Sequence, residues 1–536
     1  MTRKAMSTMT WVIIVVVVVL IVVGAISAVL LIPHTKPTSP ITTSNISTST
    51  KSTTNVTTTS TITNLVFYTW WATTGKVALN HLIPAFESSY PGYTVTKNLV
   101  PGAGGTNAKY AILALIEAGK PPSLFQSLVG ANMLSYVESS PQGLSTFINL
   151  TPVVQKEGLL NNAILPVMEA SAYNGTMLNV PVSVHSGLVL YYNLNLLREY
   201  NLPVPQNLSE LTYDTVQLAH HGVTPWMVPG ADGGYDQEQL WFAIFLSIGG
   251  PRLMDELLYG TLNLSNTAVQ EVFNETNYLF LNYTSYNYPG WQSMTWPQGI
   301  TLVDQGKAAF EVDVDSATNY LYDFLNVTTY PAVQPYLNWS NVTMVAQPFP
   351  GTQNYFPIVS DAVAVPISNQ QQAALTFIKY WISYQGQEVW TKWKAVTYYK
   401  NGTDWYNTPQ QYWMYQHLLN TSPNNFVIDP LSLFADVDAQ LYSGLLTLQQ
   451  TGSPALSAWE SQFNSSMHEE YLEWQTAAKF GLGFLGFQGH PFGGYYPPWV
   501  KSNYPSSSTS SNYYELNQTS YVKLAILLTG DSKLWR

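Results

Sequence analysis

From residue 65 onward, short apolar segments typical of strands take turns with longer segments whose apolar residues recur at helical spacing. The apolar run 65–70 predicts a strand, and 77–90 repeats its apolar residues at helical spacing. The same order continues with a strand over 93–99, a helix over 107–118 and a strand over 123–128. Such a βαβαβ order predicts a parallel sheet covered by helices, with ligands bound beyond the carboxyl ends of the strands.

The N-terminal pattern is different. Residues 11–32 carry no charge and are nearly all apolar, long enough for a helix to cross a hydrocarbon core of about 30 Å. Arg3 and Lys4 precede this run, so the positive-inside rule places everything after it outside the cell. We expect a signal or membrane-anchor helix over 1–33, followed by a Ser/Thr-rich stalk over 34–63 that has too few apolar residues to fold.

Processing of this N-terminus has two interpretations. The segment around Arg3, Lys4 and Ala5 resembles the prepilin-type signal of archaeal surface proteins, which would be cut after Ala5. An uncut anchor is the alternative. In both cases the protein is expected to be a single-pass membrane protein with its folded part extracellular.

The amino-acid composition limits the classes of molecule that the protein is expected to bind. The chain has 536 residues, a formal charge of −11, only 10% charged residues and no cysteine. The lack of cysteine excludes disulfides, cysteine-ligated zinc and thiol catalysis, and the acidic balance argues against nucleic acid. A small or neutral partner is favoured. Because uncharged polar groups change little with pH, the composition also suggests an acidic external habitat.

Asn-x-Ser/Thr sequons support the outside location. Three lie near the ends of the chain, at Asn45, Asn55 and Asn517. Those within the folded part are predicted glycosylation sites: Asn149, Asn174, Asn207, Asn263, Asn274, Asn282, Asn326, Asn338, Asn341, Asn401, Asn420 and Asn464.

Three features should meet at the carboxyl ends of the first strands. Trp70 and Trp71 close the first strand, a glycine-rich loop over 101–105 follows the second, and Gln126 lies near the end of the third. An indole ring stacks well on the C–H face of a sugar ring, so a tryptophan here suggests a neutral hydroxylated ligand. One core tryptophan and one incidental surface tryptophan is the alternative. The loop is either a tight turn or a helix N-terminus offering N–H groups to ligand oxygens.

Acidic residues alternate with apolar ones over 310–315. Glu311, Asp313 and Asp315 would share one face of a strand, where paired carboxylates could serve a glycosidase or hold a metal. A solvated strand face is the commoner explanation and the one favoured here. The chain contains no G-x-S-x-G, HExxH or P-loop motif, and the sequence predicts no cofactor and no metal site.

A series of short motifs gives a family resemblance. The chain resembles the extracellular sugar-binding proteins of ABC transporters (solute-binding protein family 1), and among them the glucose-binding members of archaea and thermophilic bacteria. The resemblance covers roughly 66–400. Its motifs lie at 66–72, 82–86, 90–92, 118–126, 180–185, 191–193, 306–310, 360–361 and 373–381.

The resemblance implies a two-lobed α/β fold of the periplasmic-binding-protein type with three crossings between the lobes. They are expected near 181–185, 361–366 and 394–397. Lobe 1 would comprise 64–181 and 366–394. Lobe 2 would comprise 185–361 and 397–536, including an irregular C-terminal extension after about residue 481.

The resemblance also implies the binding residues. The matching positions that would contact the sugar are Trp70, Trp71, Gln126, His185, Trp241, Trp296, Asp361 and Lys394. Two departures put the identity of the sugar in doubt. Leu128 stands where glucose-binding relatives have a polar residue, and 314–316 reads Val-Asp-Ser where relatives have Gly-Asp-Trp.

The expected function is therefore capture of a sugar, such as the monosaccharide glucose, by lobe closure. Delivery to the permease of an ABC importer would follow without catalysis. A surface glycoside hydrolase and a structural or adhesive surface glycoprotein are the alternatives.

Overall fold

The computed structural model describes residues 62–102 and 105–500. The predicted anchor, nearly all of the predicted stalk and the sequons at Asn45, Asn55 and Asn517 lie outside these residues. Within them, no helix combines the length and the apolar character needed to cross a membrane.

The predicted βαβαβ unit is confirmed. It consists of β1 (Thr63–Thr69), α2 (Thr74–Ser89), β2 (Tyr93–Leu99), α3 (Thr106–Glu117) and β3 (Leu124–Leu128). Strand β1 is central and pairs in parallel with both β2 and β3. The observed ends differ from the predicted ones by three residues or fewer, because the apolar periodicity of this segment is regular.

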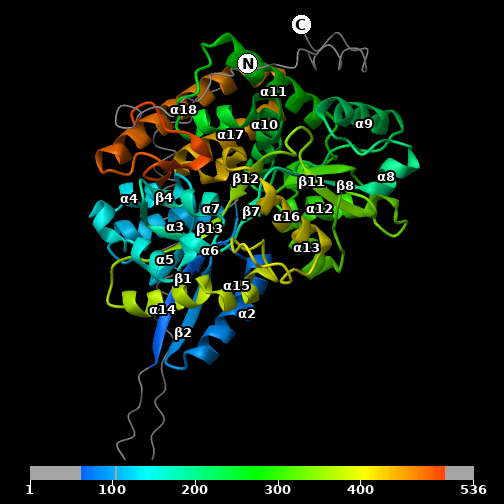
Figure 1. The fold of residues 1–536 in the computed structure, drawn as a ribbon. Helices are drawn as coiled ribbons and strands as arrows, with labels where there is room; N and C mark the ends of the chain where they lie inside the picture. Colours follow the sequence, from blue (N-terminus) through cyan, green and yellow to red (C-terminus); the bar gives the residue numbers. More distant parts are fainter. Residues whose placement is uncertain (1–61, 103–104, 501–536) are drawn as a thin grey trace, which may run out of the picture. The chain divides into compact units, whose positions relative to one another are not determined.

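Two later strands complete this sheet. Its order is β2-β1-β3-β13-β6, where β13 (Asp361–Ala364) and β6 (Asn179–Pro181) are added in antiparallel pairing. Helices α14 (Gln371–Ile382) and α15 (Tyr384–Thr391) contact α2, as Figure 1 shows. The first sheet is therefore built from segments far apart in the sequence.

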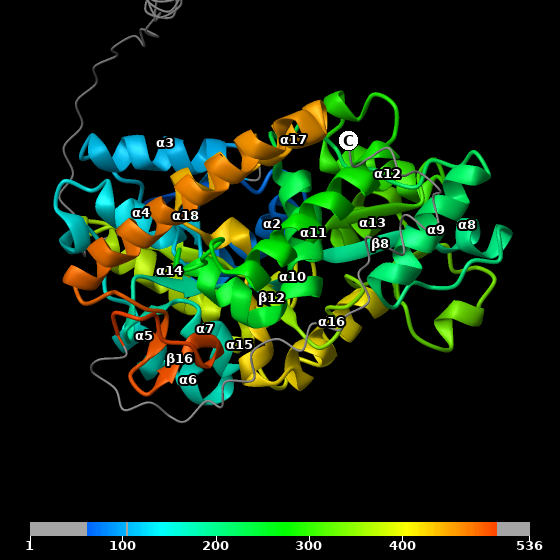
Figure 2. The same ribbon diagram turned by 90° about the horizontal axis from the view of Figure 1, so that it is seen from above.

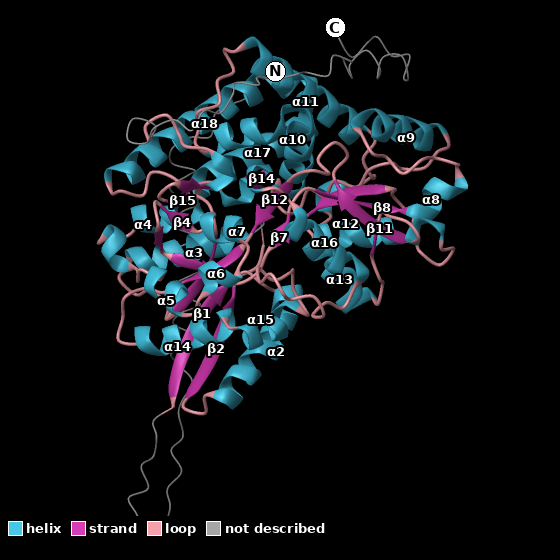
Figure 3. Cartoon of the chain, in the orientation of Figure 1, coloured by secondary structure: helices cyan, strands magenta, loops and turns pink. Residues whose placement is uncertain are grey.

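A second sheet has the order β10-β11-β8-β9 and is mostly antiparallel. Figure 3 shows its larger strands as a separate group of magenta arrows. Its strands are β8 (Val189–Asn193), β9 (Phe310–Asp313), β10 (Tyr330–Pro331) and β11 (Met344–Pro348). Helices α10 (Tyr235–Leu258) and α12 (Trp296–Asp304) contact β9.

A third, small sheet has the order β14-β12-β7, and two of its strands, β7 and β12, connect strands of the other two sheets along the chain. Its strands are β7 (His185–Ser186), β12 (Phe356–Val359) and β14 (Phe426–Ile428). The chain passes from the first sheet to the second through β7, which follows β6 and precedes β8. It returns to the first sheet through β12, which follows β11 and precedes β13. The backbones of Val184 and Val396 exchange two hydrogen bonds of 2.9 and 3.0 Å. The predicted lobe boundaries nevertheless stay a prediction.

Helices make up most of the rest. The remaining α-helices of the described residues are α4 (Asn132–Glu138), α5 (Thr151–Lys156), α6 (Leu159–Asn162), α7 (Leu165–Glu169), α8 (Leu194–Glu199), α9 (Leu208–His220), α11 (Thr267–Ser285), α13 (Ser316–Leu325), α16 (Pro409–Asn420), α17 (Ala435–Thr451) and α18 (Leu456–Lys479). Helices α17 and α18 pack against each other, and α17 also contacts α10 and α3 (Figure 2).

The segment after residue 481 corrects one expectation. It is predicted to be irregular surface, yet Leu482, Phe484 and Leu485 are buried. This stretch and the hairpin β15 (Gly486–Phe487) and β16 (His490–Pro491) pack beside the short strand β4 (Ala172–Tyr173), which pairs with β5 (Thr176–Met177). The prediction failed because glycines and prolines interrupt the spacing of the apolar residues, so no strand or helix period is visible in the sequence.

Candidate ligand-binding site

Asp361 is the centre of the candidate site. It begins β13 and lies opposite Leu128 of β3 in the first sheet. Its Oδ1 accepts hydrogen bonds from Gln126 Nε2 at 2.7 Å and from Trp71 Nε1 at 3.3 Å. Its Oδ2 accepts one from Ser183 Oγ at 3.1 Å and lies 3.2 Å from Lys394 Nζ. The carboxylate is thus fully used as an acceptor.

Sheet topology brings these side chains together. Trp71 follows β1 and Gln126 lies in β3, so both come from carboxyl ends of parallel strands. Strand β13 runs antiparallel to β3, which places its first residue, Asp361, at this same edge. Gln126 Oε1 in turn accepts from Thr69 Oγ1 and from the Trp70 backbone N–H. The side chain of Gln126 therefore joins the end of β1 to the start of β13.

His185 and Lys394 complete the group. His185 lies between two carboxylates, with Nδ1 hydrogen-bonded to Asp315 and Nε2 at 3.2 Å from Asp361 Oδ2. Lys394 Nζ lies 2.8 Å from His185 Nε2. The next residue, Ala395, has φ +59°, a left-handed conformation that costs energy in any residue but glycine. Backbone strain beside Lys394 is typical of a functional position.

The charges of this group are balanced. Burial alone would raise the pKa of Asp361, but Lys394 and the hydrogen bond from His185 together hold it well below its usual range. Burial and Lys394 disfavour the charged imidazole, but Asp315 and Asp361 outweigh them and raise the pKa of His185. Asp361 is consequently an ionised, buried hydrogen-bond acceptor.

The two adjacent tryptophans have different environments. Trp71 is 5% exposed and packs against Phe67, Trp381 and Trp390, with Lys394 Nζ 5.6 Å from its ring centroid. Trp71 is therefore a core residue, and its indole N–H donates a hydrogen bond to Asp361.

Trp70 is half-buried and lies against Gly105, the residue before α3. A Cβ at Gly105 would come within 2.9 Å of the Trp70 indole, and its φ is +100°. Only glycine permits this approach.

Trp70 and Trp296 pack against the same small group of buried side chains, here called the central cluster. It consists of Leu128, Tyr235, Val314, Val359, Leu431 and Tyr442. Trp296 is the first residue of α12, and its ring contacts that of Tyr320 edge-on at 5.3 Å. Two of the three positions expected to differ from glucose-binding relatives, Leu128 and Val314, belong to the central cluster, whereas the third, Ser316, does not.

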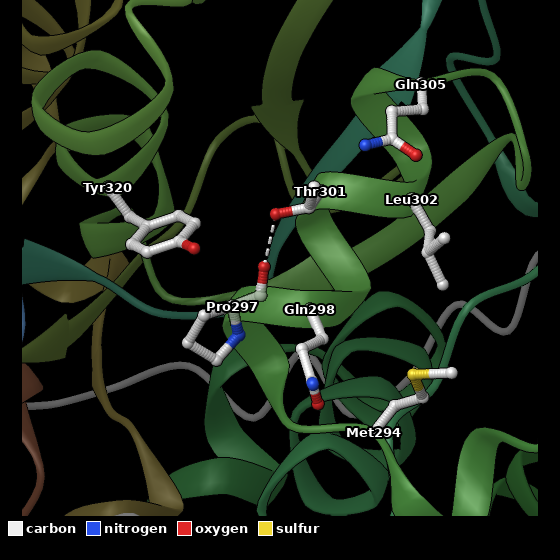
Figure 4. A pocket seen from close by; sticks show the side chains of 7 residues that line it. All are labelled: Met294, Pro297, Gln298, Thr301, Leu302, Gln305 and Tyr320. Carbon is white, nitrogen blue, oxygen red and sulfur yellow. Dashed lines mark hydrogen bonds between the residues drawn. The ribbon is translucent and has the colours of Figure 1, made fainter.

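A groove of about 260 Å³ runs along α12 next to Trp296 (Figure 4). Gln298, Thr301 and Gln305 supply its polar groups, and Tyr320 supplies an aromatic side. Thr301 Oγ1 is occupied by a hydrogen bond of 2.6 Å to the Pro297 carbonyl. None of the predicted binding residues lines this groove.

The structure therefore brings four of the other seven predicted binding residues into contact with Asp361, namely Trp71, Gln126, His185 and Lys394. Trp70 joins this group through its backbone N–H, and its side chain packs, like that of Trp296, on the central cluster. Trp241 lies elsewhere and is corrected. It is fully buried in α10, stacks on Phe245 and donates from Nε1 to Asn277 at 2.8 Å. Its indole is satisfied by the core, so it is not retained as a binding residue.

Two members of the group were not predicted to take part. Ser183 donates directly to Asp361 and lies two residues before His185, in a segment whose sequence pattern gave no sign of its role. Asp315 was predicted to share a strand face with Glu311 and Asp313, whereas it precedes α13 and bonds His185. A break of the strand after Asp313 is what separates it from the other two acids.

The expectation of a solvated acidic face is wrong. Glu311 and Asp313 are both completely buried. Neither oxygen of Glu311 has a hydrogen-bond partner among the described residues. Burial raises the pKa of Asp313 to about 7 and that of Glu311 well above its usual value. Across the described ranges, no group of three or more His, Asp or Glu side chains is arranged to hold a metal.

Most of the predicted glycosylation sites in the described part of the chain are accessible. Ten of the twelve are exposed, and Asn207 is half-buried because its side chain caps α9. Asn282 is the exception. Its side chain is buried in α11, so a glycan is not expected there.

Comparison with known proteins decides the family. Residues 71–388 match the model of the bacterial extracellular solute-binding proteins. The chain belongs to this family. Its members bind solutes and are not enzymes, which excludes the hydrolase alternative.

Relatives and solved structures agree. The chain is 58% identical over 439 residues to the glucose-binding protein GlcS of Saccharolobus solfataricus, covering 81% of this chain and 79% of the relative. It is 26% identical over 264 residues to an uncharacterized ABC transporter extracellular-binding protein of Pyrococcus horikoshii, covering 48% of this chain and 57% of that one. A chitin oligosaccharide binding protein superposes with a TM-score of 0.62 at 18% identity, covering 76% of this chain and 99% of that one. This last likeness concerns the fold, which is the two-lobed α/β fold expected.

Proposed function

We propose that the protein captures a neutral sugar, a monosaccharide such as glucose, outside the cell and delivers it to an ABC importer. The observation that carries this proposal is the group around Asp361, in which an ionised acceptor, a lysine and an amide are buried beside a half-exposed tryptophan. The 58% identity to a glucose-binding protein supports the choice of ligand.

The chemistry of the group suits hydroxyl groups. An ionised carboxylate accepts strong hydrogen bonds, and Lys394 and Gln126 can donate them to sugar oxygens. Trp70 and Trp296 both pack on the central cluster and are only partly buried, so a pyranose could stack on either ring. These polar groups contact one another in the structure, and we expect the sugar hydroxyls to replace some of these contacts.

Lobe closure would perform the capture. Asp361, His185 and Lys394 lie at or beside the segments proposed to cross between the lobes. A ligand that contacts all three would bind the closed arrangement more tightly than an open one and would shift the population toward it. The permease would then recognise the closed form.

Isothermal titration of the purified full-length chain with glucose, galactose, mannose, maltose and raffinose tests the proposal. We expect binding of at least one monosaccharide, and Trp70→Ala should weaken it about tenfold or more because stacking is lost. Trp339→Ala is the matched control, because Trp339 is an exposed tryptophan that packs with Tyr330 and Tyr336. Heat signals absent for every sugar would refute sugar binding.

The location is proposed from the sequence. The apolar run 11–32 would anchor the chain and 34–63 would act as the stalk, with glycans on the exposed sequons. After carbonate washing of membranes the chain should stay in the pellet, and its release would contradict the anchor. Cells that lack the chain should take up labelled glucose more slowly, and unchanged uptake would contradict delivery to an importer.

A further inference from the structure

The central cluster holds polar atoms that the group around Asp361 does not use. The hydroxyl of Tyr442 and Oδ2 of Asp313 are buried, and neither has a hydrogen-bond partner in the part of the chain that the structure describes. The other oxygen of Asp313 accepts from Tyr235 Oη at 2.5 Å and from the Val314 N–H at 2.7 Å. Buried polar atoms are nearly always paired in folded proteins, so two unpaired atoms beside one cluster need an explanation.

These atoms adjoin the proposed sugar site. Within the central cluster, Leu128 is the strand partner of Asp361, and Val314 precedes the Asp315 that bonds His185. The rings of Tyr235 and Tyr442 meet edge-on with centroids 6.5 Å apart. Trp70 and Trp296 pack on the same cluster. A sugar between the two indoles would therefore lie against the tyrosines.

Tyr442 comes from a part of the chain that the family model does not match. It lies in α17, beyond the matched range 71–388. Lys109 of α3 holds α17 through a fully buried ion pair with Asp438 at 2.7 Å, and Tyr110 donates to Asp436 at 3.0 Å. Since α3 begins directly after Gly105, which touches Trp70, α17 is fixed relative to the proposed stacking residue.

The backbone of Tyr442 is also fixed from the other side. A Cβ on Gly234, the residue before α10, would lie 2.1 Å from the Tyr442 carbonyl oxygen. Tyr235, the first residue of α10, is thereby held beside Tyr442. Hydroxyl groups held so firmly are suited to recognise one orientation of a ligand.

We propose that Tyr442 and the Tyr235–Asp313 pair bind hydroxyl groups of the ligand, so that the C-terminal helix α17 completes the binding site. This inference rests on the proposed function and names the ligand class as a neutral hexopyranose. A phenol both donates and accepts, and the unpaired oxygen of Asp313 accepts. An analogue that lacks the matching hydroxyl would leave them unpaired again, which makes these residues a source of specificity.

Titration of the full-length Tyr442→Phe variant with glucose tests the inference. We expect about tenfold weaker binding, the usual effect of losing one buried hydrogen bond. Tyr136→Phe is the matched control and should bind as the wild type does. Tyr136 is likewise a buried tyrosine without a hydroxyl partner among the described residues, but it packs against Phe125 away from the central cluster.

A series of monodeoxyglucoses identifies the hydroxyl. For one member, the wild type should lose about tenfold in affinity, and Tyr442→Phe should lose nothing further. Asp313→Asn serves as a second variant if thermal melting shows that Tyr442→Phe is unfolded, and about tenfold weaker binding is again expected. Wild-type affinity for glucose in both variants would overturn the inference while leaving the proposed function intact. Failure of the wild type to bind any sugar would instead overturn the proposed function and this inference together.

Discussion

Two fully buried aspartates of this protein have opposite environments. Asp361 has Lys394, His185, Gln126 and other donors around it, and its pKa lies well below the usual range. Asp214 of α9 has no hydrogen-bond partner for either oxygen among the described residues, and burial with Glu210 nearby raises its pKa to about 8. Removing a carboxylate from water costs free energy, and only donors and cations offset that cost.

Hydrogen-bond donors and cations thus decide whether a buried carboxyl group stays charged or takes up a proton. The first sheet collects charge partners at one edge, which keeps a negative charge available for a ligand. In the region of α9 and β9, carboxyl groups such as Asp214 and Glu311 are buried without hydrogen-bond partners among the described residues and are expected to hold a proton in acid. Such a region suits an acidic exterior, in agreement with the low content of charged residues.

Removal of the partnered carboxylate should have the largest effect. Asp361→Ala leaves Lys394 buried without a counter-ion, and we expect a loss of about 3–5 kcal/mol in the free energy of unfolding. Glucose binding should weaken about a hundredfold or more, since the strongest acceptor is lost. Urea unfolding and titration calorimetry measure the two effects. Asp404→Ala, at an exposed position, is the control, and equal behaviour of both variants would contradict the central role of Asp361.

Removal of Lys394 should make the charge on Asp361 costlier, although the other donors remain. In Lys394→Met the pKa of Asp361 should rise, and the free energy of unfolding should fall by about 3 kcal/mol at pH 7. The loss should be smaller at pH 4, where Asp361 can take up a proton. Urea unfolding at both pH values measures this, and Lys392→Met is an exposed control. A loss that does not depend on pH would show that charge is not the cause.

The buried carboxyl groups without hydrogen-bond partners among the described residues, such as Asp214 and Glu311, predict how stability depends on pH. For an acid whose pKa is raised by folding, the folded state binds more protons than the unfolded state between the two pKa values. Stability should therefore rise as the pH falls from about 8 toward 4. Asp214→Asn should reduce this rise by up to about 5 kcal/mol, because the raised pKa of Asp214 is worth about 1.4 kcal/mol per unit and asparagine does not titrate.

Urea unfolding from pH 4 to pH 8 measures this dependence. Asp404→Asn, an exposed change, should leave the profile unaltered. A wild-type stability that falls steadily below pH 8 would contradict the prediction.

The smallest expected effect concerns one neutral donor. Ser183→Ala removes a hydrogen bond of 3.1 Å to Asp361 and should cost about 1 kcal/mol of stability. Lys394 and His185 still face the carboxylate, so its pKa should stay low. Ser443→Ala, which affects an exposed serine, should change nothing measurable by urea unfolding. A loss as large as that of Lys394→Met would mean that the hydroxyl and not the charge keeps Asp361 ionised.

Sequence reasoning succeeded where the needed information is local. The apolar periodicity from Leu65 to Leu128 predicted three strands of the first sheet and the two helices between them. The buried face of each element is visible in the spacing of its own apolar residues. Motif resemblance added the predicted binding residues Gln126 and Asp361, which the structure joins by a hydrogen bond of 2.7 Å. Trp241 was misplaced because a tryptophan in a matching segment has the same sequence signature in a core as in a site.

The acidic strand shows what local information cannot give. Alternating acids predicted a solvated face, yet helices α10 and α12 cover β9 and bury Glu311 and Asp313. Nothing within residues 310–315 reports on those helices.

By itself, the sequence determined the class of fold and the absence of cysteine chemistry, and it predicted most of the residues of the candidate site. Only the tertiary structure decided which carboxylates are charged. The register of β13 on β3 brings Gln126, 235 positions earlier in the chain, to Asp361, and the return of the chain brings Lys394 to the same carboxylate. The charge on a buried acid depends on such partners, and their distances are fixed only when the whole chain is folded.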